Sequence, residues 1–186
     1  MNIIHNKITS FFPDLNWKTL GYENNPRIRF YFDDIKRELF EVQKLSTNII
    51  DDIFYWNPVF IAITFFSQNS EINKKIVESI KERWLINILS TKEFKLLEIE
   101  EEVAWYYYFI EIQSAEIEKI NKAIIEADFA VDPLLQLHCY YFCPEKHLVI
   151  NLYDDRGMDI ISDKVEVLQD IQNEWSDKVT IKFENT

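Results

Sequence analysis

The chain has 186 residues and a formal net charge of −12, and 47% of its residues are hydrophobic. This length and composition fit one domain, residues 1–186, with a sizeable core, and they exclude a largely disordered chain. An acidic chain with only two glycines also argues against nucleotide-binding loops and against DNA, RNA or a membrane surface as partners.

The spacing of apolar residues predicts strands and helices that alternate along the chain. Apolar residues three or four positions apart indicate helices, whereas alternating or continuous apolar runs indicate strands. In chain order we expect a short helix at residues 3–11, a strand at Arg27–Phe32, a helix at Ile35–Ile53, a strand at Val59–Phe66, a helix at Ile72–Trp84, a strand at Val103–Ile112, a helix at Ile117–Ala127, strands at Leu135–Cys143, His147–Tyr153 and Met158–Ile161, a helix at Val165–Trp175 and a strand at Val179–Phe183.

Short acidic residues precede two of these helices as predicted caps. Asp33 and Asp34 stand before the first long helix, where they would complement the positive end of its dipole. Asp163 and Glu166 have the spacing of a capping box at the start of the last helix.

The connections between the last strands indicate the fold class. Only residues 144–146 separate two of the predicted strands, and the turn around Arg156 and Gly157 is similarly short. Parallel neighbours need long crossovers, so these strands must form hairpins. The sequence therefore predicts an α+β fold, a single domain with a mixed, mostly antiparallel sheet and helices packed on it.

The excess negative charge lies entirely in the second half of the chain. Residues 1–93 contain 12 acidic and 12 basic residues, whereas residues 94–186 contain 20 acidic and 8 basic residues. Such a surface either serves solubility or attracts a basic protein. Glu100, Glu101 and Glu102 are candidate binding residues in this half, and we expect their run, Leu97–Val103, to be a solvated face or a loop.

No feature of the N-terminal sequence resembles a signal peptide, and no apolar run approaches the roughly 20 residues that span a bilayer. The two cysteines, Cys139 and Cys143, are too few for a disulfide scaffold. A cytoplasmic protein is the simplest interpretation.

His138, Cys139, Cys143 and His147 together suggest a zinc hypothesis. On an extended strand, however, the two cysteines would stand about 13 Å apart at roughly 3.3 Å per residue. Two thiolates that share a zinc ion must lie within about 4 Å of each other. We therefore expect core cysteines rather than a metal site, and we expect no cofactor.

Trp105–Phe109 is a run of five aromatic residues. A stacking platform for nucleic-acid bases would also need a basic groove. We expect a central strand covered on both sides, with an exposed aromatic patch for a protein partner as the alternative.

The most distinctive stretch is Asn151–Asp159, in which a charged turn separates two apolar runs. We expect Gly157 to close this turn with a positive φ. Arg156 is expected to lie inside the turn and to hold one of its carboxylates. A structural turn is the leading interpretation. If the turn binds a partner, the candidate binding residues are Tyr153, Asp154, Asp155 and Arg156, and a catalytic turn is the third alternative.

Leu152–Asp159 resembles the hallmark of a bacterial family of unknown function with a conserved Tyr-Asp-Asp-Arg-Gly sequence. A later helix that ends in Trp175, an upstream Arg29-Phe30 strand and a Phe12-Pro13 element are also similar to that family. The sequence departs from it after Phe30, where Tyr31-Phe32-Asp33 replaces the expected Glu-Leu-Gly. The resemblance implies a small intracellular bacterial protein and supplies no established activity.

Two classes of function follow. The first is a protein-binding, immunity-type inhibitor whose acidic face covers a basic toxin, an expectation that depends on analogy with other small acidic proteins. The second is a small cytoplasmic enzyme with a site around the Tyr153–Arg156 turn, where His138 or His147 could complete a pocket. Because the sequence offers no nucleophile with a placed base, no catalytic residue is assigned.

Overall fold

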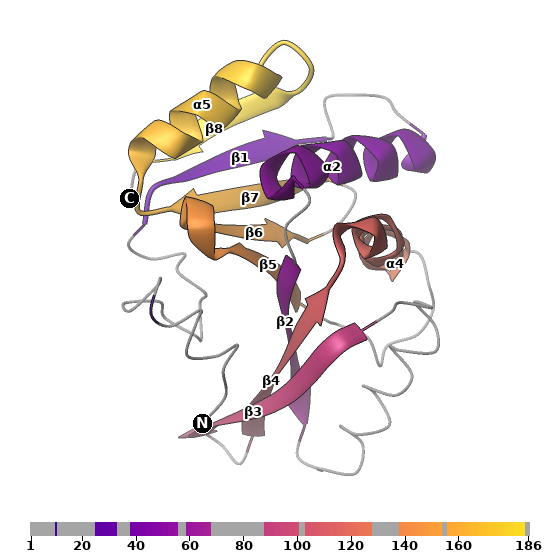
Figure 1. Ribbon diagram of the computed structural model, residues 1–186, viewed down its shortest axis with the longest axis vertical. Coiled ribbons are helices and arrows are strands. Elements are labelled where there is room, and N and C mark those ends of the chain that lie inside the picture. The colour runs from indigo at the N-terminus through magenta and orange to yellow at the C-terminus, as the bar shows by residue number, and fades with distance from the viewer. Residues whose placement is uncertain are drawn as a thin grey trace.

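Eight strands form one sheet in the computed structural model of the chain (Figure 1). The structure describes residues 10, 25–32, 38–55, 59–67, 88–100, 103–127, 138–153 and 156–184. Within these residues the elements are β1 (Arg27–Tyr31), α2 (Leu39–Phe54), β2 (Val59–Ser67), β3 (Ile88–Glu100), β4 (Val103–Ile112), the single 3-10 turn η1 (Ser114–Glu116), α4 (Ile117–Ala127), β5 (His138–Cys143), the 3-10 turn η3 (Pro144–Lys146), β6 (Leu148–Leu152), β7 (Gly157–Ser162), α5 (Val165–Trp175) and β8 (Thr180–Glu184).

The strands lie in the order β3-β4-β2-β5-β6-β7-β1-β8, and each neighbouring pair is antiparallel. The predicted α+β fold is thereby confirmed. Since β7 and β8 are both antiparallel to β1, which lies between them, they run parallel to each other. With α5 as their connection they form a split β-α-β unit, and β1 fills the gap in it.

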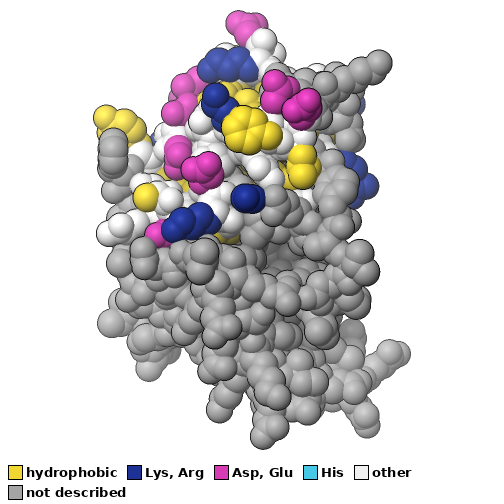
Figure 2. All heavy atoms as spheres, turned by 90° about the vertical axis from the view of Figure 1, so that its right-hand side faces the viewer, with side chains coloured by type: hydrophobic (Ala, Val, Ile, Leu, Met, Phe, Trp, Pro, Cys, Tyr) yellow, Lys and Arg dark blue, Asp and Glu magenta, His cyan; other side chains and the backbone are white. Residues whose placement is uncertain are grey.

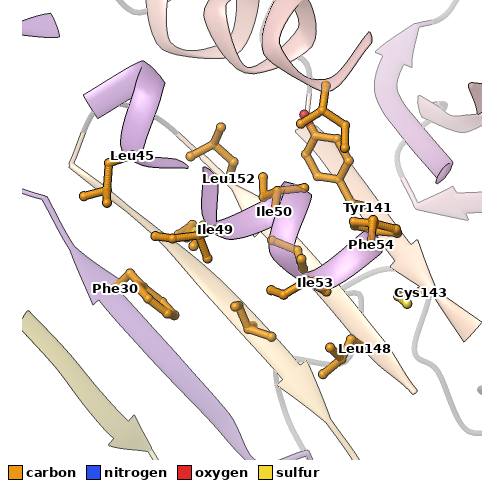
Figure 3. Packing of buried hydrophobic residues seen from close by; sticks show 14 of the residues in the cluster. Phe30, Leu45, Ile49, Ile50, Ile53, Phe54, Tyr141, Cys143, Leu148 and Leu152 are labelled. Carbon is orange, nitrogen blue, oxygen red and sulfur yellow. The ribbon is translucent and has the colours of Figure 1, made fainter. Parts of the chain in front are cut away.

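The described helices pack on one face of the sheet. In Figure 1 the strands β1 and β5 to β8 occupy the upper part of the sheet, and β2 to β4 the lower part. One cluster of buried apolar side chains joins α2, α4 and α5 to the strands. Figure 3 shows α2 lying across the sheet, with Ile49, Ile50 and Ile53 packed near Leu148 and Leu152.

The helix α2 begins later than its apolar pattern predicts. Its first residue is Leu39, and Glu38 before it is extended, with no side-chain cap. The predicted start at Ile35, with Asp33 and Asp34 as cap and first-turn charges, is therefore wrong. The part of the pattern that does form the helix is amphipathic, and its buried side chains include Val42, Leu45, Ile49, Ile50 and Ile53.

The helices α4 and α5 have the bounds that the sequence predicts. The capping box expected at Asp163 and Glu166 is wrong, because Lys164 is the N-cap of α5 and its side chain caps nothing. The hydroxyl of Ser162 instead accepts a hydrogen bond of 3.0 Å from the Lys164 amide. None of the described helices has the length and apolar composition needed to cross a membrane.

The strand β3 is the main element that the sequence patterns miss. Of the loop and the solvated face expected at Leu97–Val103, the loop is wrong, because β3 continues through Leu97 to Glu100, which pairs with Val103 of β4. The exposure of these side chains lies outside the description. Its sequence mixes Lys and Glu with apolar residues, which is typical of an edge strand. The helix predicted at Ile72–Trp84 lies outside the described residues, and so does the helix at residues 3–11 except for Ser10, which is helical.

Candidate functional site

The distinctive stretch, Asn151–Asp159, contains the end of β6, the tip of the hairpin and the start of β7. These strands are antiparallel neighbours, with Asn151 opposite Asp159 and Leu152 opposite Met158. The predicted hairpin is thereby confirmed. The two residues at its tip, Asp154 and Asp155, lie outside the described residues.

Gly157 has a different role from the one predicted, because its backbone does not adopt the left-handed conformation. It is the first residue of β7 and stands opposite Tyr31 of β1. A Cβ atom at this position would lie 2.7 Å from the hydroxyl oxygen of Tyr153 and closer still to the carbonyl oxygen of Phe30. The expectation of a positive φ is therefore wrong, and the glycine is required because two neighbours approach its backbone closely.

The last residue of the stretch, Asp159, forms a bidentate side-chain contact with Arg29 of β1. Its Oδ1 accepts a hydrogen bond of 2.7 Å from Nε of Arg29, and its Oδ2 accepts one of 3.0 Å from Nη2. The Asp159 side chain is 1% exposed and that of Arg29 is 28% exposed. A bidentate pair of this kind is strong and fixes the orientation of both groups.

A second carboxylate extends this contact to β8. Glu184 accepts a bond of 2.7 Å from Nε of Arg27, and its other oxygen lies 3.4 Å from Nη1 of Arg29. We refer to Arg27, Arg29, Asp159 and Glu184 as the arginine–carboxylate cluster. The hydrogen bond to Asp159 raises the pKa of Arg29 above its ordinary value despite the opposing effect of burial. Arg29 therefore keeps its positive charge at neutral pH.

The cluster lies on the face of the sheet opposite the described helices. Ile28 and Phe30 of β1 belong to the core beneath the helices, and successive side chains of a strand point to opposite faces. The register places Arg29 beside Asp159 on one side and Lys182 on the other. The ammonium group of Lys182 lies 4.6 Å from the centre of the Tyr31 ring, a cation–π distance.

Tyr153 and Arg156 flank the tip of the hairpin in different ways. The hydroxyl of Tyr153 lies over Gly157, and its electrostatic effect on Arg29 places it near the cluster. The side chain of Arg156 is exposed, whereas we expected it inside the turn. Its carbonyl oxygen accepts a bond of 2.7 Å from the amide of Phe32, so its backbone holds β1.

The chemistry of the cluster favours a structural role. Both oxygens of Asp159 accept hydrogen bonds from Arg29, which leaves this carboxylate poorly suited to act as a base. His147 stands at the other end of β6, six residues from Tyr153, which corresponds to about 20 Å along a strand. Its Nδ1 instead lies 3.3 Å from a carboxylate oxygen of Asp163. The pocket that would combine His147 with the Tyr153–Arg156 turn is not formed.

The zinc hypothesis depends on whether His138–Cys143 is extended, and this segment is the strand β5. Cys143 is buried, and burial raises the pKa of its thiol. Among the residues that the structure describes, no three His, Cys, Asp or Glu side chains are grouped so that they could hold a metal ion. The side chains of His138 and Cys139 lie outside the description.

The remaining candidates can be placed only by their backbone. Trp105–Phe109 belongs to β4, which pairs with β2 and β3, so this run is a strand with a neighbour on each side. Glu100 is the last residue of β3, and Glu101 and Glu102 lie outside the described residues.

The pairing of Arg29 with Asp159 is the contact that sequence patterns did not predict. Each residue belongs to a segment that carries the family resemblance, but 130 positions separate them. The available signal was an Arg-x-Arg strand and an Asp placed among the apolar residues of another strand. A buried charge in a strand requires a partner, although the sequence alone does not identify which one.

Comparison with known families gives one match. The model of a family described as Domain of unknown function (DUF3885) matches residues 4–180, a range that includes the cluster residues Arg27, Arg29 and Asp159 and the hairpin. Comparisons with curated proteins and with solved structures find no match. Because the match extends over nearly the whole chain, the protein belongs to the DUF3885 family of unknown function.

Proposed function

We propose that the protein is a protein-binding inhibitor of the immunity type, which acts in the bacterial cytoplasm and covers a basic partner such as a toxin. The observation that carries this proposal is the charge of α5. Glu166, Asp170 and Glu174 recur every four residues along it, and all three are exposed. Residues four apart lie on one side of a helix, so they form a single acidic ridge.

The composition of α5 makes this ridge unfavourable for the helix itself. Like charges four residues apart destabilise a helix by about 0.2–0.5 kcal/mol a pair. Glu174 also lies near the negative end of the helix dipole, and the last turn has no basic residue to balance it. A ridge that costs stability is easier to explain by a partner than by solubility, which scattered charges would serve equally well.

Not every described face of the molecule is acidic. Figure 2 shows the right-hand side of Figure 1, where acidic and basic side chains of the described residues are intermixed with apolar ones. Asp163, also exposed, adds a carboxylate just before α5, where it lies 3.3 Å from Nδ1 of His147. We therefore assign the binding surface to α5 rather than to the whole molecule. The acidic run at Glu100, Glu101 and Glu102 remains a second candidate contact.

Association kinetics across a salt series test the proposal. The chain is expressed with the products of adjacent genes, and the association rate with any basic partner is measured from about 50 mM to about 500 mM salt, across which screening shortens to a few Å. We expect association to slow steeply as salt rises, because exposed charges mainly steer encounter.

Two variants of equal charge change locate the surface. Glu166→Gln/Asp170→Asn/Glu174→Gln should lower the association rate more than it raises dissociation. The control, Glu38→Gln/Glu41→Gln/Asp52→Asn, removes the same charge from exposed positions at α2 and should have a smaller effect. Equal effects of the two variants, or association that does not depend on salt, would leave the acidic ridge as a solubility feature.

A further inference from the structure

The strand β1 has a sequence that does not by itself define its register. Ile28 and Phe30 face the core, and a slip of one residue would turn them to the opposite face. A slip of two residues would keep every side chain of β1 on its present face. The alternation of apolar residues therefore excludes a slip of one residue and permits a slip of two.

The hydrogen bonds show how closely the charged side chains meet. The carbonyl oxygen of Pro26 accepts a hydrogen bond from the amide of Ser162, and the amide of Phe32 donates one to the carbonyl oxygen of Arg156. In the register of β1 and β7, Pro26 stands opposite Ser162 and Phe32 stands opposite Arg156. Pairs in an antiparallel ladder alternate, so Arg29 and Asp159 form a non-hydrogen-bonded pair with β7. Side chains are closest in such pairs, which makes this position sensitive to charge.

In one direction, a two-residue slip would leave Asp159 without an arginine. Tyr31 would then stand opposite Asp159, while Arg29 would keep a carboxylate by moving opposite Glu184. A carboxylate that is 1% exposed would be buried without a cation. The carboxylate on β7 thus opposes this slip.

In the other direction, the slip would cost Glu184 its 2.7 Å hydrogen bond and leave it only the 3.4 Å contact that Arg29 now makes from the place Arg27 would take. Arg27 would move opposite Asp159, and Asn25 would take its place opposite Glu184. Arg27 would also take the place opposite Lys182 that Arg29 has now, and Arg29 would replace Tyr31, over whose ring Lys182 now lies. The carboxylate on β8 thus opposes the slip that the carboxylate on β7 permits.

We infer that the arginine–carboxylate cluster is a register device, in which Asp159 and Glu184 each block the slip of β1 in one direction. The device is needed because β1 enters the gap of the split β-α-β unit from a distant part of the sequence. No short turn ties it to β7 or β8, as the hairpin turn ties β6 to β7.

Nuclear magnetic resonance of the full chain tests the inference, because opposite Hα atoms of non-hydrogen-bonded pairs give strong cross-peaks. Between β1 and β7, the wild type should show the Arg27–Ile161, Arg29–Asp159 and Tyr31–Gly157 cross-peaks and no others. Glu184→Gln, an isosteric change at a partly exposed position, should add a second set with an Arg27–Asp159 cross-peak. Asp159→Asn should add the opposite set, with an Arg29–Ile161 cross-peak.

Lys182→Gln is the matched control on β8, because it changes the charge and leaves both carboxylates in place. This control should keep the wild-type set alone. Wild-type cross-peaks alone in Glu184→Gln would overturn the inference, even if Asp159→Asn fails to fold. A second register in Lys182→Gln would overturn it as well, since the effect would then not belong to the carboxylates.

Discussion

Two polar networks join distant parts of this chain, and they differ in charge and in exposure to water. The arginine–carboxylate cluster ties β7, β1 and β8 together on one face of the sheet. On the other face, the hydroxyl of Tyr141 donates a bond of 2.6 Å to Oδ1 of Asn121, whose amide donates one of 3.1 Å to Oγ1 of Thr47. This second network links β5, α4 and α2 without any formal charge.

The difference follows from solvation. Asn121 and Tyr141 are fully buried, where an ion would lose far more hydration energy than a neutral group. The Arg29 side chain is 28% exposed, so part of its hydration is retained while it neutralises a buried carboxylate. Charge is used where a strand must be positioned beside water, and neutral bonds are used where helices pack into the core.

Removing the cations from the cluster should have the largest effect on stability. Arg27→Met/Arg29→Met leaves the buried Asp159 without an arginine in any register of β1. The free energy of unfolding of the double variant should be about 3–5 kcal/mol lower than that of Arg27→Met alone, which is the usual cost of an uncompensated buried charge. Urea unfolding measures both variants, and a difference below about 1 kcal/mol would show that water reaches Asp159.

Gly157→Ala should have the next largest effect on stability, because the cluster depends on the close approach of β1 to β7. The new methyl group would meet the carbonyl oxygen of Phe30, which is backbone and cannot move aside. We expect a loss at the upper end of the usual range for overpacking, about 1–3 kcal/mol. Adding Tyr153→Phe should restore only part of it, and complete restoration in thermal unfolding would assign the clash to the Tyr153 hydroxyl instead.

Tyr141→Phe tests the neutral network and should cost less, about 1–1.5 kcal/mol, since one uncharged hydrogen bond is removed. The ring also packs on Phe54, with centroids 6.4 Å apart, and Phe preserves that contact. Adding Asn121→Leu should not double the loss, because both members of the bond are then gone. Additive losses in the double variant would indicate that the two side chains act independently.

Asp51→Asn should have the smallest effect and the opposite sign. Burial, and then the charges of Asp52 and Glu118, raise the pKa of Asp51. A carboxyl whose folded-state pKa is raised favours folding at low pH and opposes it as pH rises through that pKa. The variant should be more stable near pH 7 by less than about 0.5 kcal/mol, because solvent screens exposed charges.

The pH dependence distinguishes this effect from a change in packing. The gain from Asp51→Asn should shrink as pH falls through the carboxyl range and should be gone once Asp51 is protonated. Glu41→Gln serves as the control, because it removes an exposed carboxylate of the same helix that is not among the charges that raise the pKa of Asp51. A gain that is the same at every pH would contradict the electrostatic explanation.

Local sequence patterns predicted those parts of the fold that local physics determines. The bounds of α4 and α5 follow from apolar spacing, and the hairpin of β6 and β7 follows from its short connection. Edge strand β3 was missed because its charged residues interrupt the apolar pattern on which strand prediction depends. Gly157 was misassigned because turn chemistry considers neighbours in sequence, whereas its constraint comes from Phe30 on another strand.

The candidate site was predictable only in pieces. Arg29 and Asp159 both lie in segments singled out from the sequence, but their pairing depends on β1 entering between β7 and β8. Periodicity contains no information on that order of strands. The sequence alone shows that the second half is acidic. The structure was needed to show that Glu166, Asp170 and Glu174 are all exposed and so form a ridge.

The position of β1 also determines when the chain can finish folding during synthesis. Arg29 is made 130 residues before Asp159, and Arg27 is made 157 residues before Glu184. Until β8 has been made, β1 has a neighbour only on the side of β7. Closure of this part of the sheet therefore comes late in synthesis, and contacts so distant in sequence make it slow. Among the described strands, β1 is the one that waits longest for its second neighbour.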